Sequence, residues 1–477
     1  MYDTHFGEIS SGRGFMSQLI GILSVHTSSY FFCNTYFLFL FMSKKKRLIM
    51  LCYTTLCSLY LYAQPRVMGI EEMFRLADEN SESIRIYKTG KEAADEQLKA
   101  AKAQRLPDIN LSVSASYWGN GRLWDRDFGN ATKIEMPHFG NNFALEAQQV
   151  IYAGGAINSG IELAELNKLI AELDQQKNRQ DIRFLLVGYY LDLYKLKNQG
   201  YVLEKNIELT DQVIANMVAR REQGTALKND ITRYELQKET LKQQLTQVKD
   251  ACKILNHQLV TTLHLPRETK IIPDSTLVNI PIQTLSEQQW QDMAGKSNLT
   301  LQQTQTGVQI NEQKVKQERS ERLPQIALVA AEHLDGPITI EVPVLDNNFN
   351  YWYVGIGVKY NISSLFKNNQ KLKQARLNVR KAQETHRLTI EQVENAVQAN
   401  YTNLQTAYSD LRTQEKRVEL ANENYSVTNN RYQNELALLT DMLDASNAKL
   451  SADLGLVNAR INVIYHYYKM KYITHTL

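Results

Sequence analysis

Two short segments of the chain carry the polar side chains whose types and spacing could support chemistry. In the segment 430–448, Asp441 and Asp444 stand three residues apart, directly before a run of good helix formers. Carboxylates near the start of a helix accept hydrogen bonds from its free N–H groups. From its position alone, we therefore expect Asp441 to cap the helix that follows it.

The segment 219–237 repeats the arrangement of 430–448 at an offset of 431 − 220 = 211 residues. The aligned positions pair Arg220 with Arg431, Gly224 with Glu435, Ala226 with Ala437 and Asp230 with Asp441, while Tyr432 has no tyrosine opposite it. From the residues alone, Gly224 indicates a plain turn between two helices.

A second pair of segments repeats at nearly the same offset. Arg105-Leu-Pro-Asp-Ile-Asn-Leu111 resembles Arg322-Leu-Pro-Gln-Ile-Ala-Leu328, at 322 − 105 = 217 residues. Two motifs in the same order at similar offsets indicate an internal duplication. We therefore expect one structural unit used twice, over residues 64–284 and 285–477.

No constellation for covalent chemistry is present. The sequence contains no phosphate-binding glycine loop, no HExxH motif and no nucleophile elbow. His257 and His264 are seven residues apart, and we interpret them as a surface or packed pair rather than a metal site. We predict that the protein is not an enzyme and that it binds no cofactor and no metal.

Composition narrows the class of protein further. The formal net charge of +3 provides no basic field for nucleic acid, so we expect no nucleic-acid partner. Charged residues make up 22% of the chain and the mean hydropathy is −0.39, which argues against a polytopic helical membrane protein.

The N-terminal region predicts export. Lys44 to Arg47 precede an apolar run that ends near Ala63, the layout of a signal peptide over residues 42–63. A transmembrane helix is the weaker alternative because the run is short. Residues 1–41 would then be an upstream extension from a mis-assigned start. Cleavage near Ala63 leaves Cys252 as the one mature cysteine, so no disulfide framework is possible within one chain.

Prolines and side-chain periodicity predict the elements. No proline occurs in 138–265 or 344–477, so we expect long helices there. Period-two alternation predicts strands with one apolar and one polar face. In the first half we expect a helix over 70–104, strands over 109–117 and 143–152 with a loop between them, and helices over 156–219 and 229–264, with Asn229 or Asp230 as cap. In the second half we expect a helix over 285–322, a strand from 326, a loop over 333–350, a strand over 352–362, and helices over 366–429 and 438–472.

Four alternating strands of about ten residues have the length that crosses a bilayer in a tilted barrel. Aromatic residues at their ends, Tyr117-Trp118 and Tyr351 to Tyr353, resemble an interfacial girdle. Four strands cannot close a barrel, and open edges are not tolerated in lipid, so several chains would have to contribute. A small soluble sandwich attached to helices is the alternative.

Together these features resemble the TolC family of outer-membrane efflux and secretion channels. The resemblance runs from about Ile70 to the end, and it rests on the duplication, the two LPxIxL strand entries and the hairpin motif. It implies a mainly α fold with a transmembrane β portion: a homotrimer in which four strands per chain build one twelve-stranded β-barrel that continues into an α-barrel. It also implies a bacterial outer-membrane location, with contact to lipid and an extension into the periplasm.

The resemblance further implies a passive exit duct that works with a periplasmic adaptor (membrane fusion) protein and an inner-membrane pump of the RND or ABC type. Roles carried over by motif are a channel constriction or gate at Asp441 and Asp444, a closing link between hairpins at Asp230 and Tyr432, and a hairpin tip that contacts the adaptor at Gly224, Arg220 and Arg431. The chain departs from the family pattern at Glu435, where glycine is expected, and at Ala437, where arginine is expected. A secreted or periplasmic coiled-coil scaffold is the alternative function.

Overall fold

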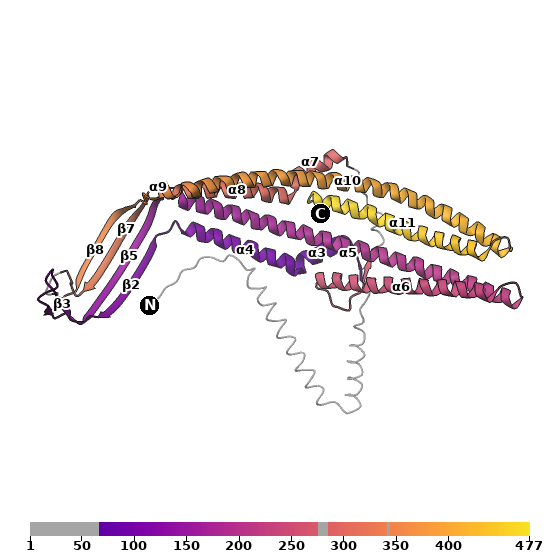
Figure 1. The fold of residues 1–477 in the computed structure, drawn as a ribbon, viewed down its shortest axis with the longest axis horizontal. Coiled ribbons are helices and arrows are strands. Elements are labelled where there is room, and N and C mark those ends of the chain that lie inside the picture. The colour runs from indigo at the N-terminus through magenta and orange to yellow at the C-terminus, as the bar shows by residue number, and fades with distance from the viewer. Residues whose placement is uncertain (1–65, 275–284, 341–343) are drawn as a thin grey trace, which may run out of the picture. The chain divides into compact units, whose positions relative to one another are not determined.

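Helices dominate the structure, and both halves of the chain follow the same order of elements (Figure 1). The computed structural model describes residues 66–274, 285–340 and 344–477. The predicted signal peptide and the upstream residues 1–41 lie outside the described residues. Val67–Arg267 and Ile271–Leu477 form one compact unit.

The elements of the first half follow the predicted order, with corrections given below for one helix and the strand limits. They are β1 (Arg66–Met68), α3 (Ile70–Asn80), α4 (Glu82–Ala103), β2 (Asp108–Tyr117), β3 (Gly121–Leu123), β4 (Thr132–Ile134), β5 (Phe139–Ala153), α5 (Ala156–Glu222), α6 (Lys228–Thr262) and β6 (Ile271–Pro273). Helix α5 has 67 residues and is therefore about 100 Å long.

The second half repeats this order. Its elements are α7 (Glu287–Ser297), α8 (Leu299–Ser320), β7 (Gln325–Gly336), β8 (Phe349–Lys359), α9 (Ser364–Lys367), α10 (Asn369–Gln433) and α11 (Leu439–Ile473). The duplication is thus visible as two copies of one plan: a broken helix, two long strands and a long helical hairpin.

The single helices predicted over 70–104 and 285–322 are wrong, because each is broken once. Ser81 has extended backbone (φ −65°, ψ 124°) between α3 and α4, and Asn298 has nearly the same angles (φ −65°, ψ 116°) between α7 and α8. The two breaks are 298 − 81 = 217 residues apart, which is the offset of the LPxIxL motifs. The Asn298 side chain accepts a hydrogen bond from the Leu301 N–H at 3.1 Å. A single small polar residue can thus end one helix and cap the next without disturbing the helical pattern.

The predicted strand limits also need correction. Strand β5 begins at Phe139, four residues before the predicted start, and β7 continues to Gly336 through residues that we expected in a loop. The predicted loop 118–142 contains the short antiparallel pair β3 and β4. Strand β5 pairs with β7 from Asn141 to Ala153, and its first two residues pair with β2. Pairing with neighbouring strands therefore extends β5 and β7 beyond the segments of regular alternation.

The four long strands form one antiparallel sheet in the order β2-β5-β7-β8 (Figure 1). The register aligns apolar positions on one face: Leu111 pairs with Leu145, and Ile326 pairs with Val358. The other face carries polar side chains; Ser112 lies in one row with His333, and Asn110 in one row with Glu146. Leu111 is 72% exposed, so the apolar face is uncovered in the single chain.

The helices form two antiparallel hairpins, α5 with α6 and α10 with α11, and α4 and α8 pack against α5. Helix α10 packs against its neighbours through Ala375, Val397 and Leu404, which are buried. The largest core gathers residues from both halves around Tyr190, whose hydroxyl donates to the Met68 carbonyl at 2.7 Å and accepts from the Asp274 N–H at 2.8 Å. In the described part of the chain, no helix has the length and apolar character needed to span a membrane.

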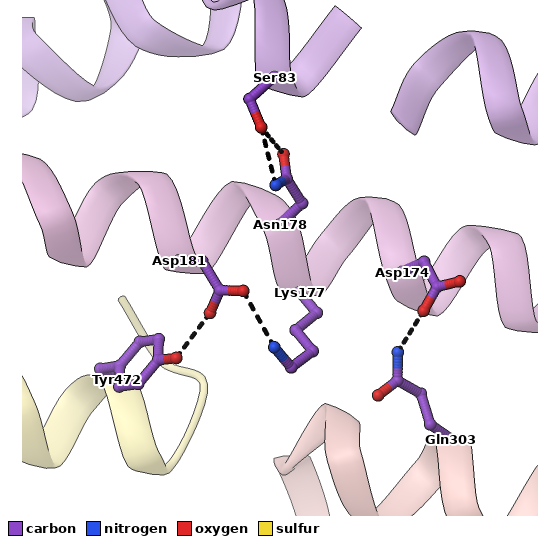
Figure 2. A network of polar contacts seen from close by, with 7 residues as sticks. All are labelled: Ser83, Asp174, Lys177, Asn178, Asp181, Gln303 and Tyr472. Atoms are coloured by element: carbon purple, nitrogen blue, oxygen red, sulfur yellow. Dashed lines mark hydrogen bonds and ion pairs between the residues drawn. The ribbon is translucent and has the colours of Figure 1, made fainter. Parts of the chain in front are cut away.

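Polar contacts along α5 hold it against three other helices (Figure 2). Asn178 donates to the Ser83 hydroxyl of α4 at 2.9 Å, and Asp174 accepts from Gln303 of α8 at 2.6 Å. Asp181 accepts from the Tyr472 hydroxyl of α11 at 2.6 Å. Hydrogen bonds of this kind depend on geometry, so they set the position of α5 along its neighbours. Through α5, both hairpins are anchored at the end away from their turns.

Candidate gate at the tips of the two helical hairpins

The first hairpin turns at Gly224, as the sequence predicts. Gly224 has φ 77°, the left-handed conformation that glycine adopts without strain. Its N–H donates to the Arg221 carbonyl at 3.0 Å, and the Thr225 N–H donates to the Arg220 carbonyl at 2.9 Å. These two bonds form a Schellman motif, which satisfies the last free carbonyls of α5.

The second hairpin makes the same turn with a glutamate in place of the glycine. Glu435 has φ 64°, and its N–H donates to the Tyr432 carbonyl at 3.1 Å. The Leu436 N–H donates to the Arg431 carbonyl at 2.8 Å. The departure from the family pattern at Glu435 therefore leaves the turn intact and adds backbone strain, because a side chain disfavours positive φ.

Asp230 and Asp441 cap the two returning helices from the third helical position. The Asp441 carboxylate accepts from the Leu438 N–H at 3.0 Å, and the Asp230 carboxylate accepts from the Leu227 N–H at 3.4 Å. The prediction that Asn229 or Asp230 occupies the cap position itself is wrong, because the N-cap residue is Leu227. The capping interpretation of Asp441 is confirmed at this shifted position.

Asp444 differs from Asp441 although the two are only one turn apart. Asp444 is exposed on α11, and within the described residues its carboxylate has no hydrogen-bond or ion-pair partner. Asp441 is also exposed, but one of its oxygens is held by the main chain. Of the two aspartates, Asp444 therefore keeps its carboxylate unengaged and available to solvent and ions.

Arg220 crosses from the first hairpin to the second. Its guanidinium donates to the Gln433 carbonyl at 2.6 Å and to the Tyr432 carbonyl at 3.4 Å, and it lies 5.4 Å from the centre of the Tyr432 ring. Arg431, its counterpart in the repeat, donates to the Leu436 carbonyl of its own loop at 3.2 Å. The two arginines share a sequence position but not a role.

Below the turns, an apolar cluster joins all four helices. Met217 of α5, Ile231 and Tyr234 of α6 and Met442 of α11 are buried together, with Tyr432 packed against them. We call these residues the four-helix cluster. Burial raises the pKa of Tyr234, and its hydroxyl has no hydrogen-bond partner among the described residues.

The predicted link between Asp230 and Tyr432 is not present as a hydrogen bond between these two side chains in the described residues. Burial raises the pKa of Tyr432, the Arg220 cation opposes that rise, and the Asp230 carboxylate adds to it. The three residues therefore lie near one another, but Arg220 makes the contact. Sequence alignment within the chain singled out Arg220, yet it offered no signal that the acceptor would be main-chain carbonyls.

Comparison with known proteins identifies the family. The model of the outer membrane efflux protein family matches residues 74–263 and 290–465. The chain belongs to this family. The first matched segment lies within the first half of the chain and the second lies within the second half.

Individual relatives are distant in sequence. The outer membrane efflux protein BepC of Brucella suis biovar 1 (strain 1330) is 21% identical over 391 residues, which cover 81% of each protein. The outer membrane protein VceC of Vibrio cholerae has the same fold, with a TM-score of 0.73 at 15% identity over 85% of this chain and 95% of VceC. A membrane protein of Pseudomonas aeruginosa gives a TM-score of 0.71 at 14% identity, over 85% and 93% of the two chains.

Membership of the outer membrane efflux family places the protein in the outer membrane, as a channel that serves efflux. The resemblance to the TolC family is thereby confirmed, and so are the mainly α fold with a β portion and the prediction that the protein is not an enzyme. The coiled-coil scaffold, which was the alternative function, is not supported.

Proposed function

We propose that three copies of this chain form one exit duct, in which each chain supplies four strands to a twelve-stranded β-barrel. The observation that carries the proposal is the sheet with two unlike faces. Its apolar face is exposed, with Leu111, Trp352 and Ile356 each about 70% accessible. Exposed apolar surface of this extent is stable only against lipid or a partner.

The edges of the sheet support the same assembly. Strands β2 and β8 each have one side without a partner strand in the described chain. Unpaired main-chain groups are costly in lipid, so β8 of one copy pairs with β2 of the next until the barrel closes. The polar face, with Ser112, Glu146 and His333, then lines the interior.

The long hairpins continue the duct on the periplasmic side of the membrane. Helix α5, at about 100 Å, is far longer than a helix of an ordinary globular domain. The hairpin tips, with Gly224 and Arg431, face a periplasmic adaptor, and an inner-membrane pump of the RND or ABC type supplies the energy.

Asp444 and Asp441 form the gate of this duct. Three copies of each aspartate bring like charges together, which attracts cations and repels anions. Because the main chain holds the Asp441 carboxylate and leaves that of Asp444 unengaged, Asp444 contributes more to ion selectivity. Asp441 instead shapes the start of α11.

The test is ion conductance of the purified trimer in planar bilayers, for wild type and for Asp444→Asn, Asp441→Asn and Asp230→Asn. Asp230 is the matched control, since it makes the same capping contact in the first hairpin. We expect a cation-selective wild type, loss of most cation preference in Asp444→Asn, a smaller change in Asp441→Asn and none in Asp230→Asn.

Each component of the proposal can fail separately. Folded protein that does not conduct would remove the channel assignment for this assembly. Conductance with unchanged selectivity in Asp444→Asn would move the gate elsewhere. Native mass spectrometry in detergent counts the chains, and any stoichiometry other than three contradicts the twelve-stranded barrel.

A further inference from the structure

We infer that Arg220 is the latch that fastens the two hairpins of one chain to each other at their tips, and that its hydrogen bonds go to main-chain carbonyls at the C-terminal end of α10. This inference rests on the proposed exit duct for its functional meaning. It replaces the link expected between Asp230 and Tyr432, and it assigns Arg220 to a contact inside the protomer instead of a contact with an adaptor.

The chemistry of the contact comes from the helix terminus. The last carbonyls of a helix have no intrahelical partner, and they carry the negative end of the helix dipole. Arg220 places two guanidinium N–H groups on two consecutive carbonyls, those of Tyr432 and Gln433. The planar fork of arginine suits this geometry, and the Tyr432 ring beneath the cation adds a cation–π contact.

The two repeats end their long helices with different side-chain contacts. At the end of α5, the Thr225 hydroxyl donates to the Arg220 carbonyl at 3.1 Å, so the first hairpin closes its own terminus. The aligned residue in the second hairpin is Leu436, since 225 + 211 = 436, and leucine has no hydroxyl. The carbonyl aligned with that of Arg220 is that of Arg431, which accepts the Leu436 N–H at 2.8 Å. Arg220 instead donates to the carbonyls one and two residues further along, those of Tyr432 and Gln433.

Arg431 does not provide a matching hold in the other direction. Its guanidinium donates to the Leu436 carbonyl within its own turn. At the turns the fastening is therefore one-sided, since it comes from Arg220 of α5, whereas Gln237 of α6 and Asn447 of α11 are hydrogen-bonded at 2.7 Å further along the returning helices. Arg431 offers a control with the same residue type at the equivalent position.

The Arg220 side chain lies beside a cleft at the tips of the two hairpins. Beyond the four-helix cluster, a cleft of about 370 Å³ lies between the ends of α5 and α10, lined by Asn216, Arg220, Asn429 and Tyr432 among others. The Arg220 guanidinium bridges the two helices at this cleft. Loss of its hydrogen bonds would leave the ends of α5 and α10 held together by the packing of Tyr432 against the cluster.

The distance between hairpin ends tests the latch without reference to transport. Spin labels are placed at Val218→Cys and Val427→Cys, which are exposed sites on α5 and α10, in a Cys252→Ser background. Labelled chains are diluted into unlabelled trimers, and distances are measured by pulsed electron resonance. We expect Arg220→Gln to lengthen or broaden the distribution, Arg220→Lys to do so less, and Arg431→Gln to match the wild type.

Conductance is measured on the same variants. We expect Arg220→Gln to raise single-channel conductance or open time several-fold, with Arg431→Gln unchanged. A distance distribution in Arg220→Gln that matches the wild type overturns the latch. A wild type that does not conduct overturns the exit duct instead, and the distance measurement still decides the latch. Equal effects in Arg220→Gln and Arg431→Gln also overturn it, because they would show a general loosening of both turns.

Discussion

Gly224 and Glu435 occupy the same place in the two hairpins, and both have positive φ, 77° and 64°. Left-handed backbone costs roughly 1 kcal/mol for a residue with a side chain. We predict that Glu435→Gly raises the free energy of unfolding by about 0.5–1 kcal/mol, since added freedom in the unfolded chain offsets part of the gain. Thermal unfolding in detergent measures it. Gly224→Ala should lower stability, and a destabilised Glu435→Gly would show that the glutamate makes a compensating contact.

Gly154 and Gly155 connect β5 to α5. Alanine substitutions at these two positions can distinguish the cost of a steric clash from the cost of backbone strain. Both have positive φ, but a Cβ at Gly154 would lie 2.8 Å from the Ser320 carbonyl, whereas nothing lies within 4 Å at Gly155. We predict that Gly155→Ala costs about 1 kcal/mol and that Gly154→Ala costs a further 1–3 kcal/mol, because the backbone must shift. Unfolding midpoints of the two variants give the difference, and equal midpoints would contradict the close approach to Ser320.

Substitutions of Asp441 and Asp444 should differ in their effect on stability as well as in their effect on conductance. We predict that Asp441→Ala destabilises the first turn of α11 by about 1 kcal/mol, while Asp444→Ala changes it by less than about 0.5 kcal/mol. Hydrogen exchange of a peptide that begins near Leu438 reports this turn. Asp230→Ala should have a smaller effect on α6, because its bond to the Leu227 N–H is longer. Equal exchange in the Asp441 and Asp444 variants would rule out the cap.

Acidification should weaken the packing of α10 against α11 through His466. The His466 Nδ1 atom lies 3.0 Å from the side-chain oxygen Oδ1 of Asn400. Burial lowers the pKa of His466, and the nearby Lys469 cation lowers it further. The unfolded chain therefore takes up the proton first, near its reference pKa of about 6.5. The contribution of His466 to stability is fully present above that pH, and it is lost as the pH falls through the pKa of His466 in the folded protein.

The matched variant for this pH dependence is His466→Gln, which can still bond to Asn400. At constant ionic strength, we expect the unfolding temperature of the wild type to fall more than that of the variant when the pH is lowered from 7.5 to 5.5. An equal loss in both would assign the pH dependence to other groups, such as His475, whose pKa burial also lowers.

Much of the architecture is local and could be predicted from the sequence. Long helices follow from proline-free stretches of helix formers, and the two-faced strands follow from period-two alternation. The turn at Gly224 follows from a residue type that tolerates positive φ. These features depend on neighbours within a few residues, so the chain by itself encodes them.

The tertiary structure decided what the equivalent residues of the two halves do. Arg220 and Arg431 look alike in sequence, but their acceptors are respectively the end of another hairpin and a carbonyl five residues away. Asp441 and Asp444 are both exposed acids on one helix, and only a main-chain hydrogen bond distinguishes them. Duplication copies the residues of a unit, whereas the role of each copy depends on which distant groups the fold brings within hydrogen-bonding distance.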